Sequence, residues 1–121
     1  LKDGTKLLDG RPQEQYEGKS KSPIVRAEGT LPGAVNIPHS RFYSQDEALF
    51  SQPEKIKELS QAVGIGPDQQ NIVFCNTGHW ASIAWFALSE VAGNKNTRMY
   101  DGSMAEWTSD PSRSVEDKTG S

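Results

Sequence analysis

The sequence predicts an α/β domain with helices on both faces of a central, mostly parallel sheet. Short apolar runs that stop at loop residues alternate with segments of helical period, and parallel strands need such crossover helices. The runs lack the alternation of a half-exposed strand, which indicates strands buried on both faces. Since 121 residues suit one domain, we expect residues 1–121 to form a single unit.

Four apolar runs of three or four residues fit strands: 6–9, 34–37, 71–74 and 98–100. The first run delivers Asp9 to a loop at Gly10, and the third leads directly into Cys75. Residues 13–29 are polar, rich in glycine and serine, and are expected to form a surface loop.

Two segments have the pattern of helices. The first has Ser51 as its expected cap, Pro53 at its first position and Gly64 as its stop, with Ile56 and Leu59 on its apolar face. The second, 81–91, is apolar nearly all round, so we expect it to be buried on more than one side. Residues 109–121 are polar and are expected to be a flexible tail.

Composition excludes several classes of function. A net charge of −3 without a Lys/Arg cluster argues against nucleic-acid binding, and no apolar run is long enough to span a membrane. Cys75 is the only cysteine, so an internal disulfide and a Cys-x-x-Cys pair are excluded. With only His39 and His79 beside it, no metal site or cofactor is expected. The compartment stays open between the cytoplasm and a bacterial periplasm.

Cys75 is the candidate nucleophile. Ligands of such sheets bind beyond the carboxyl ends of the strands, where this cysteine stands. The loop from Asn76 to Trp80 can curl so that its N–H groups face the sulfur, and Gly78 permits the close approach. These groups and the next helix's positive end favour the thiolate, and a protonated His79 would add to that field. The alternative is a buried cysteine that serves only packing.

Four segments resemble, in order, the signatures of the rhodanese superfamily: 7–11, 29–38, 75–81 and 100–107. Together they cover most of the chain. The Asp-Gly-Ser…Glu-Trp ending is most similar to the carboxyl-terminal catalytic domain of tandem thiosulfate or 3-mercaptopyruvate sulfurtransferases. This resemblance implies that the chain is the second half of a tandem, with a preceding rhodanese-like domain as a partner.

The resemblance further implies a sulfurtransferase. Cys75 would take sulfane sulfur from a small donor as a persulfide and pass it to a thiol or a cyanide-like acceptor. The substrate-binding residues implied are those of the loop and one arginine: Asn76, Thr77, Gly78, His79, Trp80, Ala81 and Arg11. Arg11 could bind the donor's anionic group or simply pair with Asp9.

The chain also departs from the family pattern. Thiosulfate-using relatives typically place Arg and Lys after the cysteine, and mercaptopyruvate users place Gly and Ser. Asn76 and Thr77 match neither, and Gln15 stands where relatives often offer a second arginine, so the donor stays open. Asp101 and Ser103 could border the pocket or bond within their own turn.

Two alternative functions are considered. A cysteine-dependent phosphatase needs Cys-x5-Arg to clamp the phosphoryl oxygens, and here the sixth residue after Cys75 is Ala81. Phosphatase activity is therefore not expected. A non-enzymatic sulfur carrier, or a module that senses redox state or binds a partner through its thiol, remains as the alternative to the enzyme.

Overall fold

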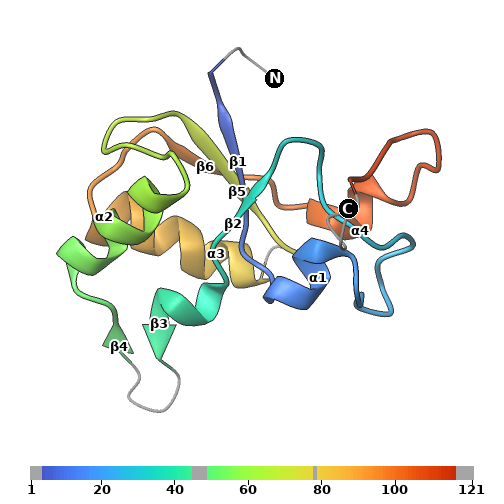
Figure 1. The fold of residues 1–121 in the computed structure, drawn as a ribbon, viewed down its shortest axis with the longest axis horizontal. Helices are drawn as coiled ribbons and strands as arrows, with labels where there is room; N and C mark the ends of the chain where they lie inside the picture. Colours follow the sequence, from blue (N-terminus) through green and yellow to red (C-terminus); the bar gives the residue numbers. More distant parts are fainter. Residues whose placement is uncertain (1–3, 45–48, 78, 117–121) are drawn as a thin grey trace.

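A computed structural model describes residues 4–44, 49–77 and 79–116. At its centre is a four-stranded sheet in which every pairing is parallel (Figure 1). Its strands, in spatial order, are β2 (Val35–Asn36), β1 (Lys6–Asp9), β5 (Asn71–Phe74) and β6 (Thr97–Met99). All four strands were expected, each to within about one residue at either end. The predicted α/β class with a mostly parallel sheet is confirmed.

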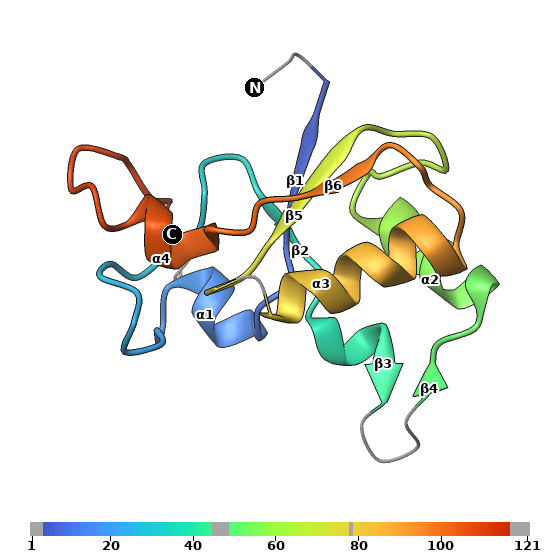
Figure 2. The ribbon, with the colours of Figure 1, turned by 180° about the vertical axis from the view of Figure 1, so that it is seen from behind.

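Helices lie around this sheet. On one side are α2 (Pro53–Ala62) and α3 (His79–Phe86), the latter continued by a π-helical turn, Ala87–Val91 (Figures 1 and 2). On the other side are the short α4 (Ser103–Trp107) and the loop before β2. Near the carboxyl ends of the strands lie α1 (Gln13–Glu17) and an antiparallel pair, β3 (Tyr43–Ser44) with β4 (Leu49–Phe50).

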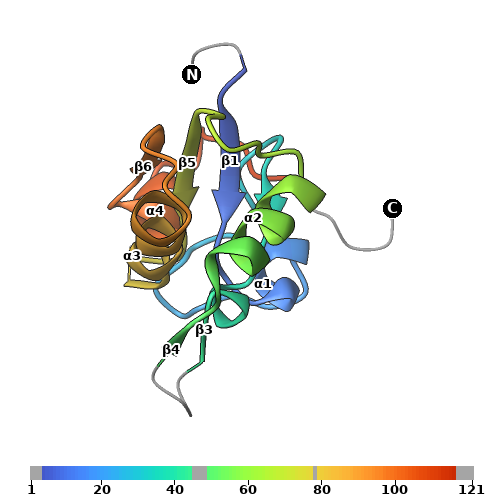
Figure 3. The same cartoon turned by 90° about the vertical axis from the view of Figure 1, so that its left-hand side faces the viewer.

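The alternation of side chains along the strands divides the core into two clusters. Leu8 and Val73 face α2 and α3, where they join Ile56 and Leu88. Leu7 and Phe74, their neighbours in the chain, belong to the second cluster, with Val25, Leu31, Ala34 and Met104. Each sheet face therefore has its own apolar layer, and Figure 3 shows the sheet with its covering elements from the side.

The start of α2 differs from the expectation. Gln52, not Ser51, occupies the N-cap position and makes no capping hydrogen bond through its side chain. The Ser51 hydroxyl instead donates to the carbonyl of Arg41 at 2.8 Å, because the chain turns there to follow β4. The end of the helix is as expected: Gly64 adopts φ +87° just after it, a conformation that favours glycine.

Two further boundaries were wrong. Residues 13–29 are not all loop, because α1 occupies the first part; its five residues are too few to show an apolar period. The helix after Cys75 begins at His79 and not at residue 81. The apolar pattern predicted a start at residue 81, although Trp80 in the first turn also packs against the core cluster of Leu8 and Val73. Gly78, which was expected to shape this turn, lies outside the described residues.

The described part of the tail is hydrogen-bonded to the body. The backbones of Glu116 and Thr30 exchange two hydrogen bonds, with N···O distances of 2.7 and 3.0 Å. Trp107 donates from Nε1 to the carbonyl of Ser114 at 2.8 Å. The flexibility of residues 109–121 stays a prediction. No helix among the described residues is long and apolar enough to cross a membrane.

Candidate active site

Cys75 directly follows β5 and lies at the carboxyl edge of the sheet, with none of its surface exposed. Its backbone is held from both sides by the start of α4. The N–H of Cys75 donates to Ser103 Oγ at 3.0 Å, and its carbonyl accepts from the N–H of Met104 at 2.9 Å. The position of the cysteine therefore depends on a segment that follows it by about 28 residues.

Ser103 forms this link through an unusual backbone. It is the one non-glycine residue with positive φ in the described part of the chain, at +52°. Its hydroxyl donates to the carbonyl of Tyr100 at 2.8 Å, so the expected bond within its own turn is present. The hydrogen bond that Ser103 Oγ accepts from the N–H of Cys75 was not expected. The N–H of Ala105 also donates to the carbonyl of Asn76 at 2.8 Å, so α4 binds two successive carbonyls of the cysteine loop.

Two carbonyls of the cysteine loop accept hydrogen bonds, whereas its backbone N–H groups lack described acceptors. Within residues 4–44, 49–77 and 79–116, the N–H groups of Asn76 and Thr77 donate to no acceptor. The first turn of α3 follows immediately, and the N–H groups of a first helical turn lack partners within the helix. These donors and the positive helix end can stabilise a thiolate or an anionic sulfur species bound beside Cys75.

A small hollow of about 240 Å³ opens beside the cysteine. Five of the described residues line it: Ser22, Cys75, Asn76, Thr77 and Trp80. None of these five residues is an arginine, a lysine, an aspartate or a glutamate. Sequence reasoning missed Ser22, because it stands more than fifty residues before the cysteine in a loop with no apolar period. The described part of the lining therefore offers hydroxyl, amide and aromatic contacts and no fixed cation.

Trp80 forms one wall of the hollow. Its ring stacks on that of His39, with centroids 4.6 Å apart and planes 10° from parallel. The N–H of His39 donates to the carbonyl of Gly10 at 2.9 Å, and ring Nδ1 lies 3.2 Å from the same oxygen. His39 begins a short 3₁₀ helix, His39–Arg41, and is bonded to Gly10 through its backbone, so the Trp80 ring is held between this helix and the hollow.

Arg11 is buried behind the site and not in the hollow. Its guanidinium binds the Asp9 carboxylate with an N···O distance of 2.8 Å, both side chains being 0% exposed. It also donates from Nη2 to the carbonyl of Gly29 at 2.7 Å, while Thr30 donates to Asp9 at 2.8 Å. Its contact with the site is a longer one, 3.4 Å from Nη1 to Oδ1 of Asn76. The described geometry matches a structural pair with Asp9.

The side chain of Asn76 is fixed between two partners. Oδ1 faces Arg11, and Nδ2 donates to Oε1 of Gln15 at 2.8 Å. Gln15 comes from α1, the helix that the sequence pattern did not reveal. Because its amide is bonded at both ends, Asn76 presents its backbone N–H and little further hydrogen-bonding capacity to the hollow.

The structure thus brings together Cys75, Asn76, Thr77 and Trp80 of the predicted site. Ala81 is buried in the core cluster below them, where it contributes backbone only. The side chain of His79 lies outside the described part. Among the described residues, no cluster of three or more His, Cys, Asp or Glu side chains could hold a metal ion.

Comparison with known proteins identifies the family. The model of the rhodanese-like domain matches residues 1–110. A protein of Mycolicibacterium smegmatis named "Putative thiosulfate sulfurtransferase" is 34% identical over 113 residues, which are 88% of this chain and 40% of the relative. A protein of Haloferax volcanii with the same name is 35% identical over 109 residues, 86% of this chain and 38% of the relative.

Solved structures share the fold. EanB in complex with ergothioneine superposes with a TM-score of 0.88 at 23% identity, over 99% of this chain and 30% of that chain. A second structure is an EanB variant with a cysteine persulfide, in a tetrahedral intermediate state with ergothioneine. It superposes with a TM-score of 0.85 at 24% identity, over 95% of this chain and 29% of that chain. The present chain spans about 40% of the length of its curated relatives. With its domain model matched over residues 1–110, the chain belongs to the rhodanese family.

Proposed function

We propose that this domain is a sulfurtransferase in which Cys75 carries sulfur as a persulfide. The observation that carries the proposal is the position of the thiol, at the carboxyl end of β5, against a hollow whose loop amides at Asn76 and Thr77 have no other described acceptor. The names of the relatives and the cysteine persulfide of a structural neighbour support the same chemistry.

The reaction takes two displacement steps. The Cys75 thiolate attacks the outer sulfur of the donor, a new S–S bond forms, and the donor's S–S or S–C bond breaks with its electron pair leaving on the departing group. A thiol or cyanide-like acceptor, as its nucleophilic anion or lone pair, then attacks the outer sulfur of the persulfide. The electron pair of the persulfide bond returns to Cys75, which regenerates the thiolate without any net oxidation.

Mass spectrometry tests the persulfide directly. Incubation with a productive donor should add one sulfur, about 32 Da, to the wild-type chain and nothing to Cys75→Ser. Steady-state turnover with cyanide or a thiol as acceptor distinguishes an enzyme from a carrier or a thiol sensor. Sulfur found on another residue, or turnover that survives Cys75→Ser, would show that the proposal is wrong.

We also propose that the donor carries less charge than thiosulfate. A dianion leaves water at a high cost, and the described lining of the hollow supplies no cation in return. A single charge-assisted hydrogen bond contributes about 1.5–3 kcal/mol, which is about one to two orders of magnitude in rate. Thr77→Lys, at an exposed residue of the lining, should therefore raise kcat/KM for thiosulfate. Efficient wild-type turnover of thiosulfate, or no gain in the variant, would contradict this.

Tandem organisation is a separate proposal. The relatives are about two and a half times as long as the stretch that matches them, which leaves room for a preceding rhodanese-like domain. The resemblance of the Asp-Gly-Ser…Glu-Trp segment to carboxyl-terminal catalytic domains supports the same arrangement.

A further inference from the structure

Two peptide groups of the cysteine loop are oriented by α4. The carbonyl of Cys75 accepts a hydrogen bond from the N–H of Met104 at 2.9 Å. The carbonyl of Asn76 accepts one from the N–H of Ala105 at 2.8 Å. In a planar trans peptide the N–H points opposite to the C=O. The N–H groups of the same two peptides, which belong to Asn76 and Thr77, therefore point away from α4, and both residues line the hollow beside Cys75.

The side chain of Asn76 is a competitor for these two donors. Asparagine side chains readily accept hydrogen bonds from backbone N–H groups close to them in sequence, as in Asx turns. Such a bond would withdraw an N–H group from the hollow. Two partners hold the side chain in another direction. Arg11 donates from Nη1 to Oδ1 at 3.4 Å, and Gln15 accepts from Nδ2 through Oε1 at 2.8 Å.

The orientation of the Asn76 amide follows from these partners. A guanidinium only donates hydrogen bonds, so the atom that faces Arg11 must be the oxygen. The nitrogen then faces Gln15, which must present its own oxygen. The contact with Arg11 is long, and that guanidinium is already bound to Asp9 at 2.8 Å. The bond to Gln15 is therefore the stronger of the two restraints on Asn76.

The short helix α1 holds Gln15 in place. The hydroxyl of Tyr16 donates to the carbonyl of Ala34 at 3.1 Å, which ties the helix to the segment before β2. Gly18 ends the helix with φ +93°, and its N–H donates to the carbonyl of Gln15 at 3.3 Å. The side chain of Gln15 is half-buried and is not among the described residues that line the hollow. Its influence on the hollow therefore passes through Asn76.

We propose that Gln15 is a positioning residue for sulfur transfer: it keeps the Asn76 side chain away from the loop N–H groups and so leaves these donors to the sulfur of Cys75. The sulfur-transfer part of this inference rests on the proposed function. The effect on the thiol itself does not, because the same N–H groups stabilise the thiolate, which is the reactive form towards any electrophile.

A double-mutant cycle with Gln15→Met and Asn76→Ala tests this role. Methionine has nearly the size of glutamine but no amide oxygen, so the Asn76 amide is released and can take up a loop N–H. The readout is the rate at which iodoacetamide alkylates Cys75, followed by mass spectrometry. Gln15→Met should slow alkylation about threefold to tenfold. In the Asn76→Ala background, which has no competing amide, the same substitution should change the rate less than about twofold.

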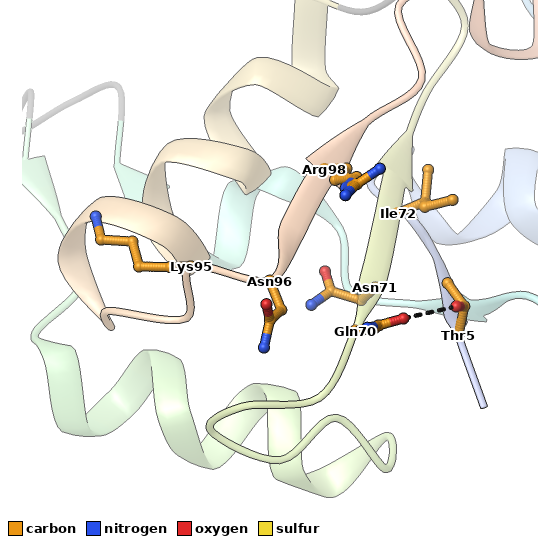
Figure 4. A pocket seen from close by; sticks show the side chains of 7 residues that line it. All are labelled: Thr5, Gln70, Asn71, Ile72, Lys95, Asn96 and Arg98. Carbon is orange, nitrogen blue, oxygen red and sulfur yellow. Dashed lines mark hydrogen bonds between the residues drawn. The ribbon is translucent and has the colours of Figure 1, made fainter. Parts of the chain in front are cut away.

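Two other glutamines provide matched controls. Gln13 also belongs to α1, and its exposed side chain donates to Glu17 at 3.0 Å. Gln70 accepts a hydrogen bond from the Thr5 hydroxyl at 3.4 Å, at the amino end of the sheet and opposite to Cys75 (Figure 4). Gln13→Met and Gln70→Met should each leave the alkylation rate within about twofold of the wild type. A melting curve of every variant checks that it is folded, and Asn76→Leu supplies a second background without an amide.

Three results would overturn the proposal: alkylation of Gln15→Met at the wild-type rate, equal slowing with and without the Asn76 amide, and equal slowing in Gln70→Met. The second result would mean that Gln15 acts only by stabilising α1. Sulfur loading of the wild type is measured in parallel. If no donor adds sulfur to Cys75, the proposed function is wrong, while the alkylation cycle still decides whether Gln15 positions the loop.

Discussion

At the scale of single residues, the ion pair between Asp9 and Arg11 is the most demanding feature of the site. Both side chains are fully buried, and four further atoms are bonded to them, among them the Gly29 carbonyl and the Thr30 hydroxyl. Removal of one partner leaves the other charge buried without compensation. We therefore expect Arg11→Ala to lower the free energy of unfolding by about 3–5 kcal/mol, measured by urea titration.

Arg113→Ala is the matched control. Arg113 also pairs with an aspartate, Asp110, but at 3.8 Å and with both side chains exposed. Such a pair contributes about 0–1 kcal/mol. Arg113 also lies over the Trp107 ring, 5.1 Å from its centroid, so the control should lose no more than about 1–2 kcal/mol in all. Equal losses in the two variants would contradict the role assigned to burial. If Arg11 bound donor and did not serve the fold, Arg11→Ala would instead raise KM at unchanged stability.

Ser103 should affect both stability and sulfur loading. Ser103→Ala removes the acceptor of the Cys75 N–H and leaves a buried donor unpaired, which costs about 1–3 kcal/mol. Because the backbone of the nucleophile is then held less firmly, we expect the rate of persulfide formation to fall as well. Ser109→Ala, at an exposed hydroxyl bonded only within its own turn, is the control. Loading at the wild-type rate in Ser103→Ala would show that this bond does not position Cys75.

Tyr100 should give a measurable pH dependence. Burial raises the pKa of Tyr100 above its usual value of about 10, and its hydrogen bond to Glu106, at 2.7 Å, adds to the increase. The folded state holds this proton more tightly, so the stabilisation is complete below about pH 10 and is lost as pH rises through the raised pKa. Between about pH 9 and 11, the wild type should lose more unfolding free energy than Tyr100→Phe. If the unfolding free energies of the two proteins fell in parallel with pH, the raised pKa of Tyr100 would be contradicted.

The sequence pattern predicted which residues line the hollow better than it predicted the contacts that hold them in place. Cys75 was found from its place after an apolar run, and the loop that follows it does line the hollow. Ser22 and the bonds from Ser103 and Gln15 to the cysteine loop were not found. Each of these contacts joins residues far apart in the sequence through polar atoms, and such contacts leave no periodic signal.

At the scale of elements, strands and the long helices were predictable because burial imposes a period on them. Ile56 and Leu59 do face the core from α2, and 71–74 is a strand along its whole predicted length. Polar termini and short elements carry no such signal, which is why α1 and the first turn of α3 were missed. The cap of α2 was misplaced by one residue, because the N–H and the hydroxyl of Ser51 both donate to the segment before β3, to the carbonyls of Phe42 and Arg41.

That misplaced cap leads to a stabilising substitution. Gln52 holds the N-cap position with extended backbone, φ −63° and ψ 150°, and its exposed side chain bonds no N–H of the helix. Ser or Asp at this position accepts such a bond and commonly stabilises by about 1 kcal/mol. We expect Gln52→Ser to raise the melting temperature by about 3–5 °C. Gln61→Ser, at an exposed position inside the helix, is the control and should not stabilise.

At the scale of the whole molecule, the described part of the tail closes the α4 side of the fold. The Glu116 backbone pairs with Thr30, beside the Arg11 and Asp9 network, and Val115 packs on the second core cluster. Gly29 allows this close approach: its φ is +113°, and a Cβ there would lie 2.7 Å from the carbonyl oxygen of Glu116. The polar composition of the tail predicted flexibility. Backbone hydrogen bonds form whatever the side chains are, so composition alone gives no sign of the bonds between Thr30 and Glu116.

Deletion of residues 109–121 distinguishes these two descriptions. If the tail is only a flexible appendage, the shortened chain should melt at the wild-type temperature. The structure leads us to expect a loss of about 2 kcal/mol, because the deletion removes both Thr30 backbone bonds, the bond of Trp107 to Ser114 and the packing of Val115. A chain that ends at Glu116 keeps all of these contacts and is the control.

Hydrogen exchange gives a second measure. The Thr30 amide should be protected in the control and should exchange rapidly in the shorter chain, because Glu116 provides its acceptor. Rapid exchange of that amide in both chains would instead show that the tail frays as its composition predicts.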